Sequence, residues 1–96
     1  MAARNIRGAG EAPCVADAWV YLLRCADGTL YTGWTVDVDR RLAAHTAGTA
    51  SRYTRSRRPL TLAASWPMPD RSAAMREEAR IKALSRAAKL RLLDAA

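Results

Sequence analysis

The segment Leu30–His45, LYTGWTVDVDRRLAAH, predicts a short strand that passes almost directly into a helix. Leu30–Trp34 has the composition of a strand. Gly33, near its end, permits a positive φ angle or the close approach of another group to the backbone. Asp37 is a favourable N-cap for a helix that runs to about Ala47. The change from strand to helix within so few residues brings polar groups from both elements to one place.

Three of those polar groups could surround one small site. Val38 and Leu42, four residues apart, mark the buried face of the expected helix. Arg41 and His45 have the same spacing and lie beside that face, so their side chains can converge. Tyr31 lies on the strand face that carries the glycine. Taken singly, a strand tyrosine, a snorkelling arginine and a lone histidine usually have structural roles, so the hypothesis of a site depends on their combination.

Two further strands are expected on either side of this segment. Trp19–Cys25, WVYLLRC, is a continuous apolar run, which is typical of a strand covered on both faces. The Asp-Gly pair that follows it predicts a hairpin to the strand at Leu30–Trp34. Leu60–Trp66 is the third strand, in which alternate residues are expected on one side. These residues are Leu60, Leu62, Ala64 and Trp66.

Two helices are expected after the third strand. Asp70 or Ser72 begins the first, which runs to about Leu84, and Ser85 can cap the second. The residues that the last helix carries inward are expected to be Leu90 and Leu93. The polar and basic segment from residue 46 to residue 59 predicts a loop. The resulting order is β-β-α-β-α-α, which indicates a fold of the α+β class.

The length of 96 residues is enough for one small domain. Residues 1–17 predict a flexible arm, because Gly, Pro, Ala and scattered charges occur there without periodicity, and the domain is therefore expected at residues 18–96. Cys14 and Cys25 are too few for a disulfide framework or a zinc cluster. No stretch approaches the roughly 20 apolar residues of a membrane span, and no signal peptide is recognisable. A reduced, cytoplasmic protein without a membrane partner is expected.

The balance of charges indicates an anionic partner. The formal net charge is +7, from 16 Lys and Arg against 9 Asp and Glu, and most of the basic residues are arginines. Arginine presents a planar fork that matches two phosphate oxygens at once, so nucleic acid is the first candidate. The alternative is an ordinary solvated surface in a protein whose coding sequence favours arginine over lysine.

Six residues are candidates for binding nucleic acid, because basic side chains with an interleaved aromatic ring suit a phosphate backbone and a stacked base. They are Arg40, Arg52, Tyr53, Arg55, Arg57 and Arg58. Five of them belong to the expected loop, for which an ordinary solvated loop is the alternative. Trp34 could likewise stack on a base or fill the core.

The helix after the third strand carries two acidic candidates. Ala74, Ile81 and Leu84 mark its inner side, and both Glu77 and Glu78 fall near that side by helical spacing. A carboxylate there is costly unless it is paired or bound to a cation. A salt bridge to Arg80 or Lys82 is the structural alternative, and periodicity does not decide between the two glutamates.

The ordered set of motifs resembles the GIY-YIG nuclease superfamily, in particular its small stand-alone bacterial members. The matching pieces are VYLL at 20–23, YTG at 31–33, DVDRRLAAH at 37–45, RRPLTL at 57–62 and DRSAAMREEARIKAL at 70–84. The match spans roughly Trp19 to Lys89. It departs from the family pattern where Trp19 stands for the first glycine, and Val20 and Thr32 each stand for an isoleucine. The family's downstream polar residue has no clear counterpart.

This resemblance implies a small three-stranded antiparallel sheet flanked by helices and a divalent-metal phosphodiesterase site. The implied site residues are Tyr21, Tyr31, Gly33, Arg41, His45 and Glu78, with Glu78 as the metal ligand. With one inward carboxylate, a single Mg²⁺ or Mn²⁺ that keeps several waters is expected. Tyr31 would act as general base and Arg41 would bind nonbridging phosphate oxygens. Tyr21 would orient water or phosphate, and His45 would share a proton with a tyrosine or contact the phosphate.

The function that follows is a metal-dependent endonuclease that hydrolyses phosphodiester bonds in DNA, with a role in DNA repair or recombination. Branched or damaged DNA is a possible substrate, RNA is not excluded, and a monomer or weak dimer is expected. One alternative is a non-catalytic nucleic-acid-binding module that retains the fold. Another is a domain that serves only as a protein interaction partner.

Overall fold

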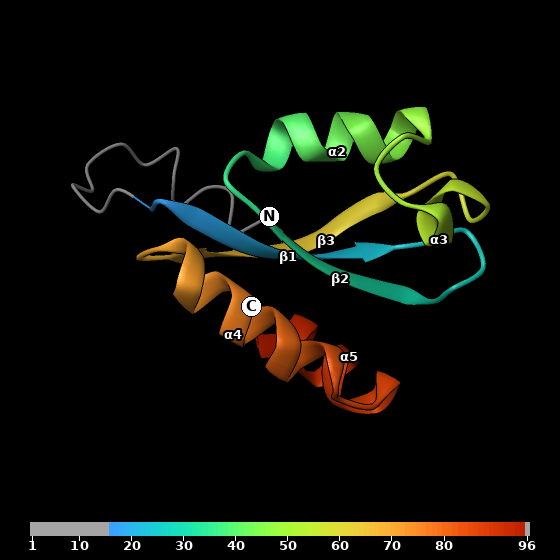
Figure 1. Ribbon diagram of the computed structural model, residues 1–96. Coiled ribbons are helices and arrows are strands. Elements are labelled where there is room, and N and C mark those ends of the chain that lie inside the picture. The colour runs from blue at the N-terminus through green and yellow to red at the C-terminus, as the bar shows by residue number, and fades with distance from the viewer. Residues whose placement is uncertain (1–15, 96) are drawn as a thin grey trace.

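The chain folds around a three-stranded antiparallel sheet with helices on both faces. The structure is a computed structural model that describes residues 16–95, so residues 1–15 of the expected arm lie outside it. The strands are β1 (Ala18–Arg24), β2 (Leu30–Thr35) and β3 (Thr61–Met68), in the spatial order β2-β1-β3. Figure 1 shows α2 (Val38–Ala47) on one face of the sheet and α4 (Arg71–Lys82) on the other. The expected α+β fold is confirmed.

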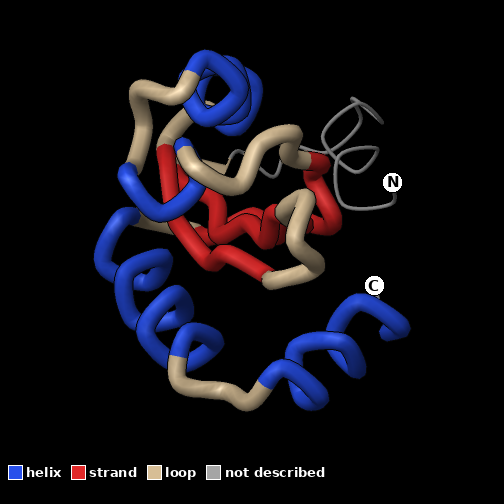
Figure 2. Tube along the Cα trace, turned by 90° about the vertical axis from the view of Figure 1, so that its right-hand side faces the viewer, coloured by secondary structure: helices blue, strands red, loops and turns tan. Residues whose placement is uncertain are grey.

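β1 is the central strand, which explains its continuous apolar sequence. Ala18, Val20 and Leu22 are fully buried against Ala74 and Ile81 of α4. The intervening residues of β1 are buried as well, and their side chains point to the opposite face. Figure 2 shows a helix, α2 of Figure 1, above that side of the sheet. Because both faces are covered, alternation between apolar and polar residues is absent from this strand.

The helices begin at the residues with capping side chains. Asp37 accepts a hydrogen bond from the Arg40 amide at 3.0 Å, as expected. At α4 the cap is Asp70, which accepts from the Ala73 amide at 2.7 Å, so the alternative start at Ser72 is wrong. Ser85 caps α5 (Arg86–Ala95) by accepting from the Ala88 amide at 3.1 Å.

The inner face of α5 differs in part from the expectation. Leu93 packs against the core as predicted, but its companion there is Leu92, whereas Leu90 is half-buried outside that cluster. Within residues 16–95, none of the helices combines the length and the apolar character that a membrane crossing requires.

Two expectations for the middle of the chain were wrong. The segment from 46 to 59 is not entirely loop, because residues 52–55 form the short helix α3 (Arg52–Arg55), capped by Ser51 through the Thr54 amide at 3.2 Å. β3 does not end at Trp66 but continues through Pro67 to Met68. An edge strand tolerates proline, since one side of its backbone needs no partner in the sheet.

A register shift in β3 also changes which of its residues share a face. Ala64 lies opposite Leu22, but Leu62 lies opposite Leu23. Cross-strand partners share a face, and neighbours along a strand point to opposite faces. Alternation alone predicted Leu62 on the side of Ala64 and Trp66. The register shift places Leu62 on the opposite face, so this prediction was wrong. The inserted residue is Ala63, which packs against the core cluster between the sheet and α4.

Thr32 offers a test of the packing in β2. Its side chain is 2% exposed, and its hydroxyl has no hydrogen-bond partner among the described residues. Replacement by valine keeps the shape and removes an unsatisfied buried group, so Thr32→Val is expected to raise the free energy of unfolding by about 1 kcal/mol. Urea denaturation measures this change. A loss of stability would mean that the hydroxyl has a partner, such as a buried water.

Candidate active site

A cavity of about 400 Å³ brings together most of the residues predicted for the site. It is lined by Tyr21, Tyr31, Gly33, Trp34, Thr35, Val36, Arg41, Arg71 and Glu78. Arg41 comes from α2 and Glu78 from α4, which lie on opposite faces of the sheet. The cavity therefore spans the outer edge of β2, the edge strand next to β1. Side chains from both faces reach it there.

Strand register places the two tyrosines on one face. Tyr21 of β1 lies opposite Gly33 of β2, and Leu23 lies opposite Tyr31. The rings of Tyr21 and Tyr31 are 6.5 Å apart between centroids. The Tyr21 phenol crosses over Gly33, where an added Cβ would lie 2.5 Å from the phenol oxygen. A glycine is required at this position because the ring of its cross-strand neighbour occupies the space of a side chain.

Gly33→Ala is accordingly expected to displace the Tyr21 phenol. Tyr21 is 3% exposed, so its ring has little room to move, and we expect a loss of roughly 1–3 kcal/mol in the free energy of unfolding. Thermal denaturation measures the loss. The combined variant Tyr21→Ala/Gly33→Ala should lose less stability than the sum of the two single variants, and additivity of the two losses would contradict the contact.

Tyr21 and His45 form a buried hydrogen-bonded chain behind the cavity. The Tyr21 hydroxyl lies 2.9 Å from His45 Nε2, and His45 Nδ1 lies 2.8 Å from Thr54 Oγ1. His45 is 1% exposed and is not among the residues that line the cavity. A direct contact between His45 and a phosphate in this cavity is therefore not supported, whereas proton sharing with a tyrosine agrees with the geometry.

The environment keeps the Tyr21 hydroxyl and the His45 imidazole uncharged. Burial, and then the charge of Arg41, lower the pKa of His45 below its ordinary value of 6.5. Burial is also the main cause that raises the pKa of Tyr21, with Tyr31 adding to the rise. The partners are satisfied when Nδ1–H donates to Thr54 Oγ1 and Nε2 accepts from the Tyr21 hydroxyl. The Tyr21 oxygen then keeps lone pairs for a group in the cavity.

The lowered pKa of His45 predicts how stability depends on pH. Between the folded pKa and the unfolded value near 6.5, the unfolded chain binds more protons, so the free energy of unfolding falls as pH is lowered below 6.5. Above about pH 7 this contribution is constant. Since the chain has 1 histidine, His45→Gln should flatten the stability profile between pH 5.5 and 7 in urea titrations. An unchanged slope would contradict a buried neutral imidazole.

Arg41 and Glu78 face the cavity with functional groups that have few partners. The Arg41 guanidinium makes no hydrogen bond or ion pair with any residue in the described part of the chain. The side chain of Glu78 is 22% exposed, and its ion pair with Lys82 is long, at 3.7 Å. Glu77, in contrast, binds Arg80 through two bonds of 3.0 and 2.6 Å. The structure thus separates the two glutamates that periodicity could not distinguish.

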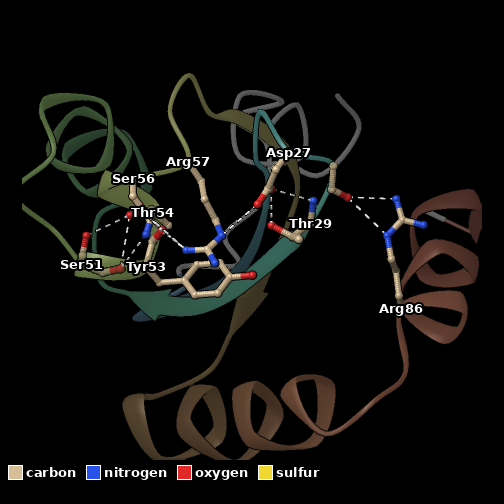
Figure 3. Close-up of polar contacts among 9 residues, drawn as sticks. Asp27, Thr29, Ser51, Tyr53, Thr54, Ser56, Arg57 and Arg86 are labelled. Carbon is tan, nitrogen blue, oxygen red and sulfur yellow. Dashed lines mark hydrogen bonds and ion pairs between the residues drawn. The ribbon is translucent and has the colours of Figure 1, made fainter.

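Tyr53 extends the aromatic group next to the cavity. Its ring centroid lies 5.8 Å from that of Tyr31, and the guanidinium carbon of Arg57 lies 3.8 Å from its centroid on top of the ring. Figure 3 shows how Arg57 is held by the Asp27 carboxylate, at 3.0 Å, and by the Tyr53 carbonyl oxygen, at 2.9 Å. In the same view Arg86 of α5 donates to the carbonyl oxygen of residue 28, at 2.9 Å. The hairpin turn is thereby tied to α3 and α5.

The basic residues predicted to bind nucleic acid differ in how far they are already engaged. Arg58 donates to the carbonyl oxygens of Arg55 and Thr46, at 3.0 and 3.2 Å, so it and Arg57 have intramolecular partners. Arg40, Arg52 and Arg55 have exposed side chains. Trp34 packs against the core, as one of its two alternatives predicted, and it also lines the cavity. Stacking of this ring on a base stays a prediction.

Sequence reasoning missed three cavity residues, Thr35, Val36 and Arg71. Thr35 and Val36 follow the recognised strand directly, and extending the motif would have found them. Arg71 precedes Glu78 by seven residues, which is two helical turns and places both on one side of α4. That spacing was the available signal.

Comparison with known proteins identifies the family. The sequence-family model for the GIY-YIG catalytic domain matches residues 17–91. The chain therefore belongs to the GIY-YIG family. A UPF0213 protein of Natronomonas pharaonis is 53% identical over 78 residues, covering 81% of this chain and 92% of that protein. A UPF0213 protein of Halobacterium salinarum is 54% identical over 70 residues, covering 73% of this chain and 91% of that protein.

A solved structure agrees with the fold. The solution NMR structure of a UPF0213 protein from Bacillus halodurans has a TM-score of 0.54 and 46% sequence identity, and it covers 81% of this chain and 83% of its own. The names of these relatives state no activity. Membership in the GIY-YIG family indicates nuclease-type chemistry and a nucleic-acid substrate.

Proposed function

We propose that this protein is a metal-dependent endonuclease that hydrolyses phosphodiester bonds in DNA. The observation that carries the proposal is the shared cavity at the edge of β2, where Tyr31, Arg41 and Glu78 meet from three different elements. A phenol can exchange a proton, a guanidinium can bind a phosphate, and a carboxylate can bind a cation. Family membership supports the reaction class.

The cavity fits one divalent ion. Glu78 is the acidic side chain among its lining residues, and residues 16–95 contain no group of three His, Cys, Asp or Glu side chains placed to share a metal. One carboxylate in an open cavity suits a single Mg²⁺ or Mn²⁺ that keeps several waters, and it does not suit a pair of ions. When bound, the ion polarises the phosphate and stabilises the leaving oxygen.

Proton transfer and phosphate binding are assigned to side chains that line the cavity. Tyr31, as the phenolate, accepts the proton of the attacking water and becomes the neutral phenol. Tyr31 is half-buried in the cavity, whereas Tyr21 is buried and has a raised pKa that keeps its proton in place. Arg41 forks onto the nonbridging oxygens as negative charge develops there. Tyr21, held by His45, presents its phenol oxygen to the water or the phosphate.

The biological setting is part of the proposal. A domain of this size is suited to substrates that are distinguished by shape, such as the branched or damaged DNA of repair and recombination. We place this activity in the cytoplasm, in a monomer or weak dimer. RNA carries the same phosphodiester linkage and remains an outcome of the test.

The test is cleavage of a substrate panel by the purified protein. Flap, junction, nicked, single-stranded and plasmid DNA, together with matched RNA strands, are incubated with Mg²⁺ or Mn²⁺ and with EDTA as control. The proposal predicts cleavage of at least one DNA substrate that stops in EDTA. Salt-sensitive binding without any cleavage would instead support a binding module that retains the fold. Absence of both at low salt would support a domain that interacts only with proteins.

A further inference from the structure

Arg71 is a cavity residue to which the proposed mechanism gives no task. It is the first residue of α4, and its side chain is exposed. It borders the candidate active site and also a neighbouring cavity of about 530 Å³, lined by Asp17, Val36, Asp70, Arg71 and Ser72. Its guanidinium makes no hydrogen bond or ion pair with any residue that the structure describes. An arginine that borders two neighbouring cavities, with no partner for its guanidinium among the described residues, can bind an external anion.

Neighbouring groups do not explain Arg71 as a structural side chain. Asp70 lines the same second cavity, but its carboxylate caps α4 through the Ala73 amide at 2.7 Å. Arg76, on the same helix, is engaged, since it donates to Ser72 Oγ at 2.9 Å. Arg71 and Arg41 thus reach one cavity from α4 and α2 with guanidinium groups that no residue within 16–95 pairs.

The two cavities have Val36 as a shared lining residue. This residue follows β2, is 49% exposed, and borders both hollows together with Arg71. A nucleic-acid strand carries one negative charge per nucleotide, so a strand whose scissile phosphate lies at Arg41 must place its next phosphates beside that site. Arg71 lies where a strand leaving the active site past Val36 would pass.

We propose that Arg71 binds the phosphate adjacent to the scissile one, so that the substrate strand runs from the β2 edge over Val36 to the start of α4. This inference rests on the proposed nuclease function and deepens it. It requires a substrate strand that continues past the cleaved bond on the α4 side, and it makes Arg71 a residue for substrate binding and register. The chemistry of the step remains with Tyr31, Arg41 and Glu78.

The first arm of the test measures binding in EDTA, where no cleavage occurs. Binding of a fluorescent flap or single-stranded DNA is followed at several salt concentrations for wild type, Arg71→Ala and Arg76→Ala. Loss of one phosphate contact should weaken binding by Arg71→Ala roughly tenfold and reduce the slope of log K against log salt by about 1. Arg76→Ala keeps the wild-type slope, because Arg76 lies outside both cavities. Equal slopes for Arg71→Ala and wild type would overturn the inference.

The second arm locates the phosphate on a substrate that wild type cleaves. One neutral methylphosphonate replaces the phosphate on either side of the scissile bond. One of the two substitutions should raise the KM of wild type and of Arg76→Ala about tenfold, with kcat nearly unchanged, and should have no further effect on Arg71→Ala. Additive losses at both positions would overturn the assignment, as would a fall in kcat alone for Arg71→Ala. If wild type cleaves nothing, the nuclease proposal fails, and the binding arm still decides whether Arg71 contacts phosphate.

Discussion

Glu78→Gln is expected to reduce metal-dependent cleavage at least about 1,000-fold while leaving the fold intact. The substitution keeps the size of the side chain and removes the charge that the acidic residue of the cavity supplies to a divalent ion. Its present ion pair with Lys82, at 3.7 Å, is too long and exposed to contribute much to stability. Initial rates on the best substrate of the panel, together with a melting curve, measure both effects.

The neighbouring residue provides a matched control. Glu77→Gln removes the same charge one position earlier, but that carboxylate is bound to Arg80 and lies outside the cavity. The rate of Glu77→Gln should stay within about twofold of wild type, since an exposed ion pair contributes less than about 1 kcal/mol. Equal losses in the two variants would mean that net charge on α4 matters, and not a carboxylate in the cavity.

Tyr31→Phe is expected to lower kcat by about 10²- to 10⁴-fold, the usual contribution of a general base. The ring remains, so its contacts with Tyr21 and Tyr53, at 6.5 and 5.8 Å between centroids, are preserved and stability should change little. The loss should appear in kcat more than in KM. Single-turnover cleavage across pH 6 to 10 measures it at each pH.

Tyr53→Phe is the control for this prediction. The variant keeps the ring and its neighbours, including Arg57 at 3.8 Å from the ring centroid. Tyr53 is not among the lining residues of the cavity. Cleavage by Tyr53→Phe should match wild type. A Tyr31→Phe variant that retains both its rate and its pH profile would show that another group, or hydroxide itself, supplies the base.

Much of the fold could be predicted because its signals are local. The apolar run of β1 and the capping side chains of Asp37, Asp70 and Ser85 specify their elements within a few residues. α3 was missed because a helix of four residues has no periodicity, and its Thr54 is fixed by a tertiary bond to His45. The register shift in β3 was missed because it also depends on tertiary pairing, since it exists only in relation to β1.

The site was predictable to the extent that its residues lie close in sequence. Tyr31 and Arg41 belong to one strand-to-helix segment, so their proximity follows from local geometry. Glu77 and Glu78 differ by about 100° around α4, and only the packing of that helix against β1 and β2 decides which one faces the cavity. Arg71 was missed because its place beside Val36 depends on the same packing.

Metal binding followed by NMR tests the central claim, that one cavity at the edge of β2 holds the ion and the reacting groups. Substoichiometric Mn²⁺ is added to ¹⁵N-labelled protein, and the broadened amide resonances are mapped. The account predicts selective broadening around Gly33, Arg41 and Glu78 that EDTA reverses, that Glu77→Gln retains and that Glu78→Gln abolishes. Broadening centred elsewhere, or unchanged by Glu78→Gln, would contradict it.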